Sequence, residues 1–293
     1  MQLAPGDMVD AMMGEAGGAT PEYMAELRLK FGLDQPLHLR LAHYLTSLAT
    51  LDLGYSHRLQ APVLALIMTR VPSTLLLMSA AIAIALPVGT LLGAAQSRRP
   101  GSALDTAISV FVLSTHALPA FWLGLMAIVF LAADRGWFPT GGLASFDAPA
   151  EGRMLDVLHH LVLPAVTLAN LYVAVYARLI RTSLLELKGA DFVRTARAKG
   201  LSPERVFWVH TVRNALLPVV TMLGMQIASM LSGAVIVESV FGWPGLGRLA
   251  YEAVFARDTN LLLGILFLGS ILVTLVNFGV DVLYGVIDPR VAA

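Results

Sequence analysis

The chain has 293 residues, of which 57% are hydrophobic and only 14% are charged, and its formal net charge is zero. Because a soluble domain carries about 25% charged residues, this composition indicates a membrane protein. The neutral balance argues against nucleic acid as a partner. A chain without cysteine has no disulfides, iron–sulfur clusters or thiol catalysis.

The first 70 residues are polar and contain seven acids and five bases, so we expect an N-terminal segment, 1–70, outside the membrane. Thr20, Pro21 and Glu22 form the pattern of a helix start, with an N-cap, a proline at the first helical position and an acid in the first turn. Gly32 is expected to end this helix.

Five charge-free stretches follow, each long enough to cross a hydrocarbon core, which takes roughly 20 helical residues. Inside lipid the backbone must satisfy its own hydrogen bonds, so these stretches are expected to be helices. Gly89 and Gly93 are spaced to permit close helix approach, and Pro119 is expected to kink its span. We therefore predict an all-α, polytopic membrane helical bundle over 71–293, with spans at about 71–97, 106–133, 157–180, 214–237 and 259–283.

Basic residues are concentrated in the connections on one side of the spans, and basic residues near span ends stay cytoplasmic. The loop 184–213 and the C-terminus are therefore expected in the cytoplasm, whereas residues 1–70, 134–156 and 238–258 face outward. The densest charge lies in the segment 186–218, which long uncharged stretches border on both sides.

Capping residues in this segment predict a short helix, Phe192–Lys199. Asp191 is placed to cap its N-terminus, and Gly200 suits the C′ position that follows its C-terminus. Phe192 and Ala196 are expected to share one face. So short a helix is unstable alone in water and must pack on a partner.

Ser202, Pro203 and Glu204 start a second helix, which continues through His210 into the span beginning near Asn214. The expected geometry is a short transverse helix, a sharp turn and a long helix continuous with a span. Two interpretations fit it: an ordinary basic loop held at the lipid headgroups, or a docking surface for another protein.

The residues DFVRTARAKGL at 191–201, followed by HTVRNALLP at 210–218, resemble the coupling loop of ABC-importer inner-membrane permeases. The resemblance is to the branch that serves dipeptide, oligopeptide and nickel uptake. Of the general importer signature, only Ala196 and Gly200 fit strictly, and Arg194 and Thr195 stand where Glu-Ala would be. The peptide branch departs from the signature in the same way.

Similarity to this branch extends along the chain in order and spacing. The matching segments are LAPGD at 3–7, FGLDQPL at 31–37, DLGYS at 52–56, PAFWLG at 119–124, HLVLPA at 160–165, VIVESVFGWPGLG at 235–247 and DPR at 288–290.

The resemblance implies a type I ABC-importer permease in a bacterial inner membrane. Its implied partners are a second homologous permease, two ATPase subunits and a periplasmic or lipid-anchored solute-binding protein. ATP and Mg²⁺ would bind to the ATPase subunits and no cofactor to this chain, which has no G-x-x-x-x-G-K-[ST] phosphate loop and is expected not to be an enzyme. The implied ATPase-coupling residues are Asp191, Phe192, Arg194, Thr195, Ala196, Arg197, Lys199, Gly200 and Leu201.

The family has a first membrane helix before the LAPGD segment, and this chain begins at that segment. Five spans are therefore present and the family's first span is missing. We expect a misassigned start codon or a truncation rather than a five-span protein.

Polar residues inside the spans are candidates for the translocation path. His116 could serve the path or bond a backbone carbonyl freed by Pro119, and Asn170 could hydrogen-bond across helices. Gln226 and Ser229 share one helix face, which fits helix packing as well as a path lining.

Glu238 lies beside the turn Phe241–Gly247 and Trp243 lies within it, where they could contact the binding protein or belong to a gate; Glu238 could also simply cap the gate loop. His159 and His160 are not expected to form a metal site, since adjacent residues on a helix point apart by about 100°.

Two other functional classes are alternatives for a chain of this composition. An ion-coupled secondary transporter needs intramembrane carboxylates, and a membrane-embedded enzyme needs clustered ionisable residues within the spans. The sequence offers neither, so the predicted function is a permease subunit that forms half of the path for peptides or a related small solute.

Overall fold

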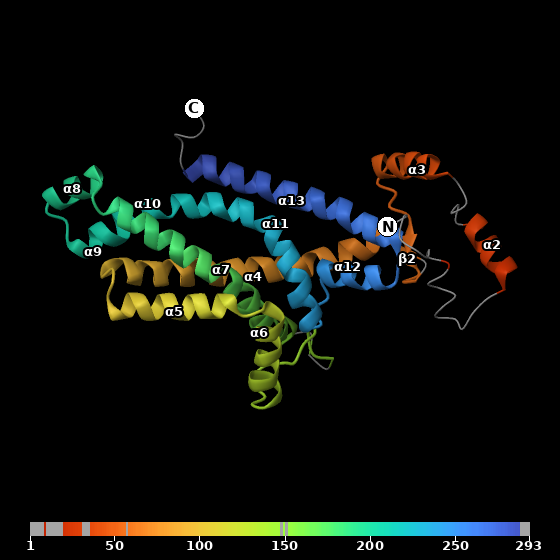
Figure 1. Cartoon of the computed structure of the whole chain (residues 1–293), viewed down its shortest axis with the longest axis horizontal. Coiled ribbons are helices and arrows are strands. Elements are labelled where there is room, and N and C mark those ends of the chain that lie inside the picture. The colour runs from red at the N-terminus through yellow and green to blue at the C-terminus, as the bar shows by residue number, and fades with distance from the viewer. Residues whose placement is uncertain are drawn as a thin grey trace.

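The computed structural model describes residues 9, 20–30, 36–56, 58–146, 149 and 152–287 and consists almost entirely of helices (Figure 1). The all-α prediction is confirmed. The first part of the chain forms α2 (Pro21–Lys30), α3 (Leu37–Ala49) and an antiparallel hairpin of β1 (Tyr55–Ser56) and β2 (Ala61–Pro62). As predicted, Pro21 opens α2, and the Thr20 hydroxyl oxygen accepts the N–H of Tyr23 at 3.4 Å. Gly32 lies outside the described residues.

Four long helices form the bundle: α4 (Val63–Arg98), α7 (Arg153–Leu187), α11 (Leu217–Val240) and α13 (Thr259–Ile287). Four stretches of the described chain are long and apolar enough to cross a membrane as single helices, and they are Val63–Arg98, Arg153–Leu187, Pro203–Ile227 and Thr259–Val280. The fourth predicted span, 214–237, corresponds largely to α11. Its residues fall in the stretch Pro203–Ile227 and in the shorter apolar piece Ser229–Val240, and Figure 1 shows α11 bent along its length.

The second predicted span, 106–133, is broken into two helices. α5 (Ala103–Ala117) ends before Pro119, and α6 (Ala120–Ala127) with the π-helix η1 (Ile128–Ala133) leaves at 97° to it. Leu118 has an extended backbone, with φ −77° and ψ 135°, as a residue that precedes proline favours. In Figure 1, α6 projects away from the bundle. The predicted kink at Pro119 is therefore a complete break.

The core is centred on α4 and α7, which pack against each other along much of their length. Gly89 and Gly93 permit this close approach: a Cβ added at Gly89 would lie 3.1 Å from the backbone oxygen of Val173, and one at Gly93 would lie 3.0 Å from the Ile180 side chain. The predicted role of the two glycines is confirmed.

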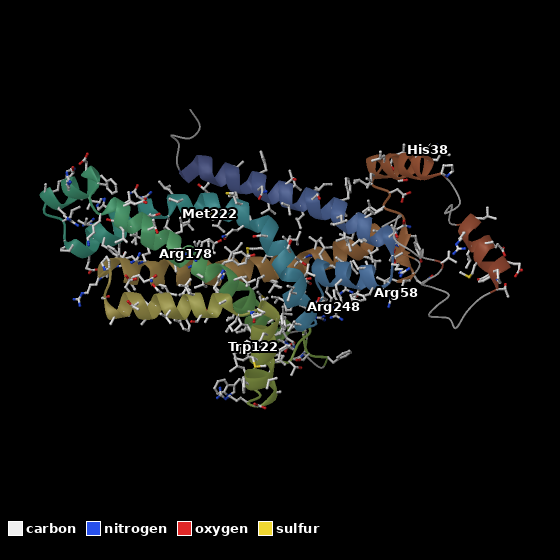
Figure 2. All side chains as sticks on the ribbon, in the orientation of Figure 1. His38, Arg58, Trp122, Arg178, Met222 and Arg248 are labelled. Atoms are coloured by element: carbon white, nitrogen blue, oxygen red, sulfur yellow. The ribbon has the colours of Figure 1, made fainter. Side chains whose placement is uncertain are left out.

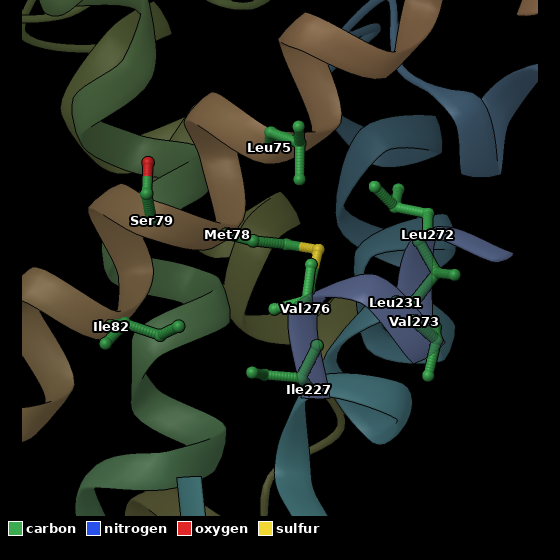
Figure 3. A pocket seen from close by; sticks show the side chains of 9 residues that line it. All are labelled: Leu75, Met78, Ser79, Ile82, Ile227, Leu231, Leu272, Val273 and Val276. Atoms are coloured by element: carbon green, nitrogen blue, oxygen red, sulfur yellow. The ribbon is translucent and has the colours of Figure 1, made fainter. Parts of the chain in front are cut away.

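An apolar cavity of about 130 Å³ lies between α4, α11 and α13 (Figure 3). Met78 of α4, Ile227 of α11 and Val276 of α13 are among the nine residues that line it. None of the four predicted path residues is among those nine, and the cavity offers almost no polar surface to a charged solute.

Beyond α11, a turn leads to α12 (Leu246–Phe255), which is followed by α13. The β-hairpin is joined to this end of the bundle by the hydroxyl of Ser56, which donates to the Asp258 carboxylate at 2.6 Å. Asp258 in turn accepts the N–H of Leu261 at 3.1 Å and caps α13. We call this the α12 end of the bundle, and the opposite end, which carries α8, the α8 end (Figure 1).

Candidate functional site

The short helix predicted in the coupling loop exists as α8 (Asp191–Ala198). It begins one residue earlier than expected. The N-cap is Ala190, and no side chain accepts a hydrogen bond from the N–H groups of the first turn. The Asp191 side chain is 98% exposed and lies 3.7 Å from Arg194. The prediction that Asp191 caps the helix is therefore wrong, although an acid in the first turn still suits the helix dipole.

The C-terminus of α8 is closed as the sequence predicts. Gly200 has φ +77°, and its N–H donates to the Arg197 carbonyl at 2.9 Å. The N–H of Leu201 reaches back to the Ala196 carbonyl at 3.4 Å. This pair of bonds is the Schellman arrangement, which favours glycine at the left-handed position.

One face of α8 is buried within the chain. Val193 and Ala196 pack with Val206, and Leu201 covers this small cluster from the turn. Phe192 lies four residues before Ala196, about 40° from it around the helix, so the two share a face as predicted. Phe192 is 39% exposed and borders the buried cluster without being part of it.

The remaining face of α8 is open to solvent in this chain. Every predicted coupling residue except Ala196 and Leu201 is exposed there, namely Asp191, Phe192, Arg194, Thr195, Arg197, Lys199 and Gly200. The face combines one aromatic ring with basic side chains. Since α8 is held from behind by apolar contacts, this face is presented in a fixed orientation.

A continuous helical stretch leads from the turn after α8 into α11. It consists of α9 (Pro203–Arg205), the π-helix η3 (Val206–Val212) and α10 (Arg213–Ala215). The Thr211 hydroxyl donates to the Val206 carbonyl, five residues back, at 3.0 Å and so supports the widened turn. The predicted second helix is confirmed, although Ser202 makes no side-chain cap.

This stretch is attached to the end of α4. The Arg98 guanidinium donates two hydrogen bonds to the Glu204 carboxylate, at 3.0 and 2.6 Å, and lies 4.8 Å from the centre of the Phe207 ring. Sequence reasoning missed this contact, because nothing in the pattern pairs residues that lie so far apart in the chain.

A second polar network, which the sequence did not predict, fixes the N-terminus of α5 at the α8 end of the bundle. The Asp105 carboxylate is buried and accepts two bonds from Arg181 of α7, at 3.0 and 2.8 Å. Gln96 and the Gly101 N–H donate to it as well. One part of this arrangement could have been predicted from the sequence, because a serine three residues before an acid is a helix-capping pattern. The Ser102 hydroxyl accepts the Asp105 N–H at 3.3 Å and caps α5.

At the α12 end, Glu238 is completely buried. Its carboxylate accepts the Thr74 hydroxyl at 2.7 Å and the backbone N–H groups of Gly247 and Arg248. The Thr74 hydroxyl also accepts the N–H of Leu246 at 2.7 Å. Glu238 and Thr74 together therefore satisfy the first N–H groups of α12, which have no partner within the helix.

Trp243 is buried as well, and its indole N–H donates to the Ser73 carbonyl of α4 at 2.9 Å. Arg248, labelled in Figure 2, bonds back to the Gly242 carbonyl at 2.7 Å. Glu238 and Trp243 are thus inside the protein in this conformation. A direct contact with a binding protein would require the turn to open, whereas a role in a gate would not.

The four path residues are not brought together. Asn170 donates from its side-chain amide to the Thr115 carbonyl at 3.0 Å, and His116 is exposed on the outer side of α5. Gln226 is buried, and the Ser229 hydroxyl donates to the Gln226 carbonyl on its own helix. The carbonyl near Pro119 is bonded by Asn170 rather than by His116.

A family model described as the inner membrane component of binding-protein-dependent transport systems matches residues 85–293. The chain belongs to this family and is a permease subunit of an ABC importer rather than an enzyme.

Curated relatives match nearly the whole chain. It is 38% identical to the di/tripeptide transport system permease DppB of Pseudomonas aeruginosa, over 99% of this chain and 91% of that protein. It is 39% identical to the oligopeptide transport system permease AppB of Bacillus subtilis, with the same coverage of both chains.

Two solved structures share the fold. An inward-facing methionine transporter, MetNI, matches 76% of this chain and 96% of its own chain with a TM-score of 0.58 and 22% identity. An amino acid ABC transporter with histidines matches 77% of this chain and 94% of its own with a TM-score of 0.53 and 18% identity. The predicted type I importer fold is confirmed.

Proposed function

We propose that this chain forms one half of the translocation path of a peptide importer and is driven by an ATPase subunit that binds α8. The observation that carries the proposal is the open face of α8, which is fixed from behind by its own apolar cluster. The relatives named above, a di/tripeptide and an oligopeptide permease, support peptides as the solute.

The exposed face of α8 suits a groove with an apolar pocket and an acidic rim. Phe192 would fill the pocket, and Arg194, Arg197 and Lys199 would meet the rim. ATP and Mg²⁺ would be bound by the ATPase subunits. Two such subunits would be needed, one for this chain and one for a second, homologous permease.

Movement of α8 would reach the spans through the stretch that follows it. α9, η3, α10 and the first part of α11 form one helical path, so a push at Val193 and Ala196 is carried by Val206 along that path. The bidentate contact between Arg98 and Glu204 would transmit the same displacement to α4.

The outer side of α5 and α6 would face the second permease and the path. An exposed His116 and the broken backbone after it lie within a charge-free stretch. Irregular backbone and ionisable groups at membrane depth are tolerated only against protein or a water-filled cavity. Trp122, labelled in Figure 2, lies on the same arm of the molecule.

The α8 end would lie in the cytoplasm of a bacterium, because basic residues gather there. The binding protein would then dock at the α12 end, above the turn that Glu238 and Trp243 hold in place. The chain would be a multi-pass protein of the inner membrane with its C-terminus in the cytoplasm and residues 1–70 in the periplasm.

The proposal is tested by reconstituting the complete transporter in proteoliposomes with binding protein, ATP and labelled di- and oligopeptides. We expect peptide uptake that requires ATP, and ATPase activity that binding protein plus peptide stimulates. A transporter prepared without this chain should show neither. Solute movement through this chain without any ATPase subunit would overturn the proposal, and stimulation by another solute but not by peptides would overturn the choice of substrate.

A further inference from the structure

The break between α5 and α6 leaves the last backbone carbonyls of α5 without their normal donors, and the carbonyl of Thr115 is one of them. In an uninterrupted helix the carbonyl of Thr115 would accept the N–H of residue 119, four positions ahead. Residue 119 is proline, which has no N–H, and the chain turns by 97° at this point. The break lies roughly midway along the charge-free stretch 106–133, where an unsatisfied carbonyl is costly.

Asn170 supplies the missing donor. It stands midway along α7, and its side-chain amide donates to the Thr115 carbonyl at 3.0 Å. One side chain therefore replaces the bond that Pro119 cannot make. This contact also fixes where α5 stops against α7.

The other end of α5 is held to the same helix. Asp105 is bound by Arg181, so α5 is attached to α7 at two places. The two attachments are ten residues apart on α5 and eleven apart on α7, or about 15 and 16 Å at the rise of an α-helix. Such matched, antiparallel spacing keeps α5 fixed along α7.

The arm beyond the break contacts α7 and also reaches the turn after α11. A Cβ added at Gly124 of α6 would lie 3.1 Å from the side chains of Val240 and Phe241, and the Gly142 N–H donates to the Phe241 carbonyl at 2.9 Å. Both arms of the break are therefore anchored within the chain, α5 to α7 and α6 to α7 and to the turn that Glu238 holds.

We propose that Leu118–Pro119 is a fixed bend in the span and that Asn170 is the residue that holds its angle. The inference goes beyond the proposed function, since it concerns the geometry of one span and makes no use of the solute or of the docking of α8.

The bend can be measured by spin labels, because this chain has no cysteine of its own to compete with engineered ones. Val110 on α5 is 58% exposed and Val129 on η1 is 42% exposed, so Val110→Cys and Val129→Cys place one label on each arm. Their Cα atoms would be about 28 Å apart along a straight helix but about 19 Å apart across the observed bend, at 1.5 Å rise per residue.

In the complete transporter in nanodiscs, we expect a narrow distance distribution near the shorter value. Asn170→Leu should broaden it toward the longer one, because the carbonyl of Thr115 has lost its donor. The matched control is Asn260→Leu, which removes another amide-to-carbonyl bond, from Asn260 to Tyr55 at 3.4 Å, far from the bend. An unchanged distribution in Asn170→Leu, or an equal change in the control, would overturn the assignment.

A double variant keeps the test decisive if Asn170→Leu does not assemble. Pro119→Ala combined with Asn170→Leu returns a backbone N–H to the Thr115 carbonyl, so this variant should assemble and show the longer distance. Failure of the double variant to assemble, or a distance like that of the native chain, would contradict the role of Asn170.

Discussion

The two ends of the bundle hold a short helix in opposite ways. At the α8 end, the acid of the first turn, Asp191, is almost fully exposed, and one face of the helix remains open. At the α12 end, the acid beside the helix start, Glu238, is buried, and its carboxylate binds the helix N-terminus and Thr74. The first helix keeps a surface for another protein, and the second is held within this chain.

The strongest test of this comparison is Glu238→Ala. It leaves the N–H groups of Gly247 and Arg248 and the Thr74 hydroxyl without their acceptor in the protein interior. We expect the free energy of unfolding to fall by about 3 kcal/mol, measured by thermal unfolding of the purified transporter. Glu252→Ala is the control, because Glu252 is half-exposed and pairs with Arg248 only at the surface. A similar loss in both variants would contradict the role given to Glu238.

A second test compares two Arg–carboxylate pairs at the α8 end. Asp105 is buried against Arg181, whereas the Glu204 side chain is 66% exposed beside Arg98. Asp105→Asn should lower the free energy of unfolding by about 2 kcal/mol, because charged hydrogen bonds in the interior are lost. Glu204→Gln should leave the unfolding temperature unchanged within error. Equal effects would show that burial does not separate the two pairs.

Local chain chemistry accounts for the elements that the sequence predicted well. Gly200 must occupy the left-handed conformation after α8, and Pro203 can open but not continue a helix, so both boundaries follow from single residues. Gly89 and Gly93 likewise show at the level of sequence that two helices approach closely. Such signals depend on neighbours in the chain and need no knowledge of the fold.

The remaining features depend on contacts between distant segments. Glu238 caps the N-terminus of α12 together with Thr74, and the Asn170 amide donates to the Thr115 carbonyl. In neither case does the sequence show which partner lies nearby. The sequence also did not show which side chains of α8 are buried, because Val206, which packs on Val193 and Ala196, lies beyond the turn. A proline also predicts a kink without predicting an angle of 97°.

A smaller effect is expected from Gly200→Val. A left-handed backbone costs a residue with a Cβ about 1–2 kcal/mol, and a β-branched one more, so the end of α8 should unfold locally. ATPase subunits should then co-purify with the transporter about tenfold less well. Gly189→Val is the control, since Gly189 precedes α8, has open space around it and lacks a left-handed backbone. Unchanged co-purification of the ATPase with Gly200→Val would count against the cap as a support for docking.

The smallest change in the stability of the chain is expected from Phe192→Ala, and this variant separates the two ends most clearly. Phe192 is 39% exposed and lies outside the buried cluster behind α8, so the unfolding temperature should stay within error. If an ATPase groove receives the ring, peptide uptake per ATP hydrolysed should nevertheless fall severalfold. Phe255→Ala at the α12 end removes a ring that is 70% exposed and should alter neither quantity. Normal uptake in Phe192→Ala would mean that the open face of α8 is only a solvated surface, and the contrast between the two ends would then lose its functional meaning.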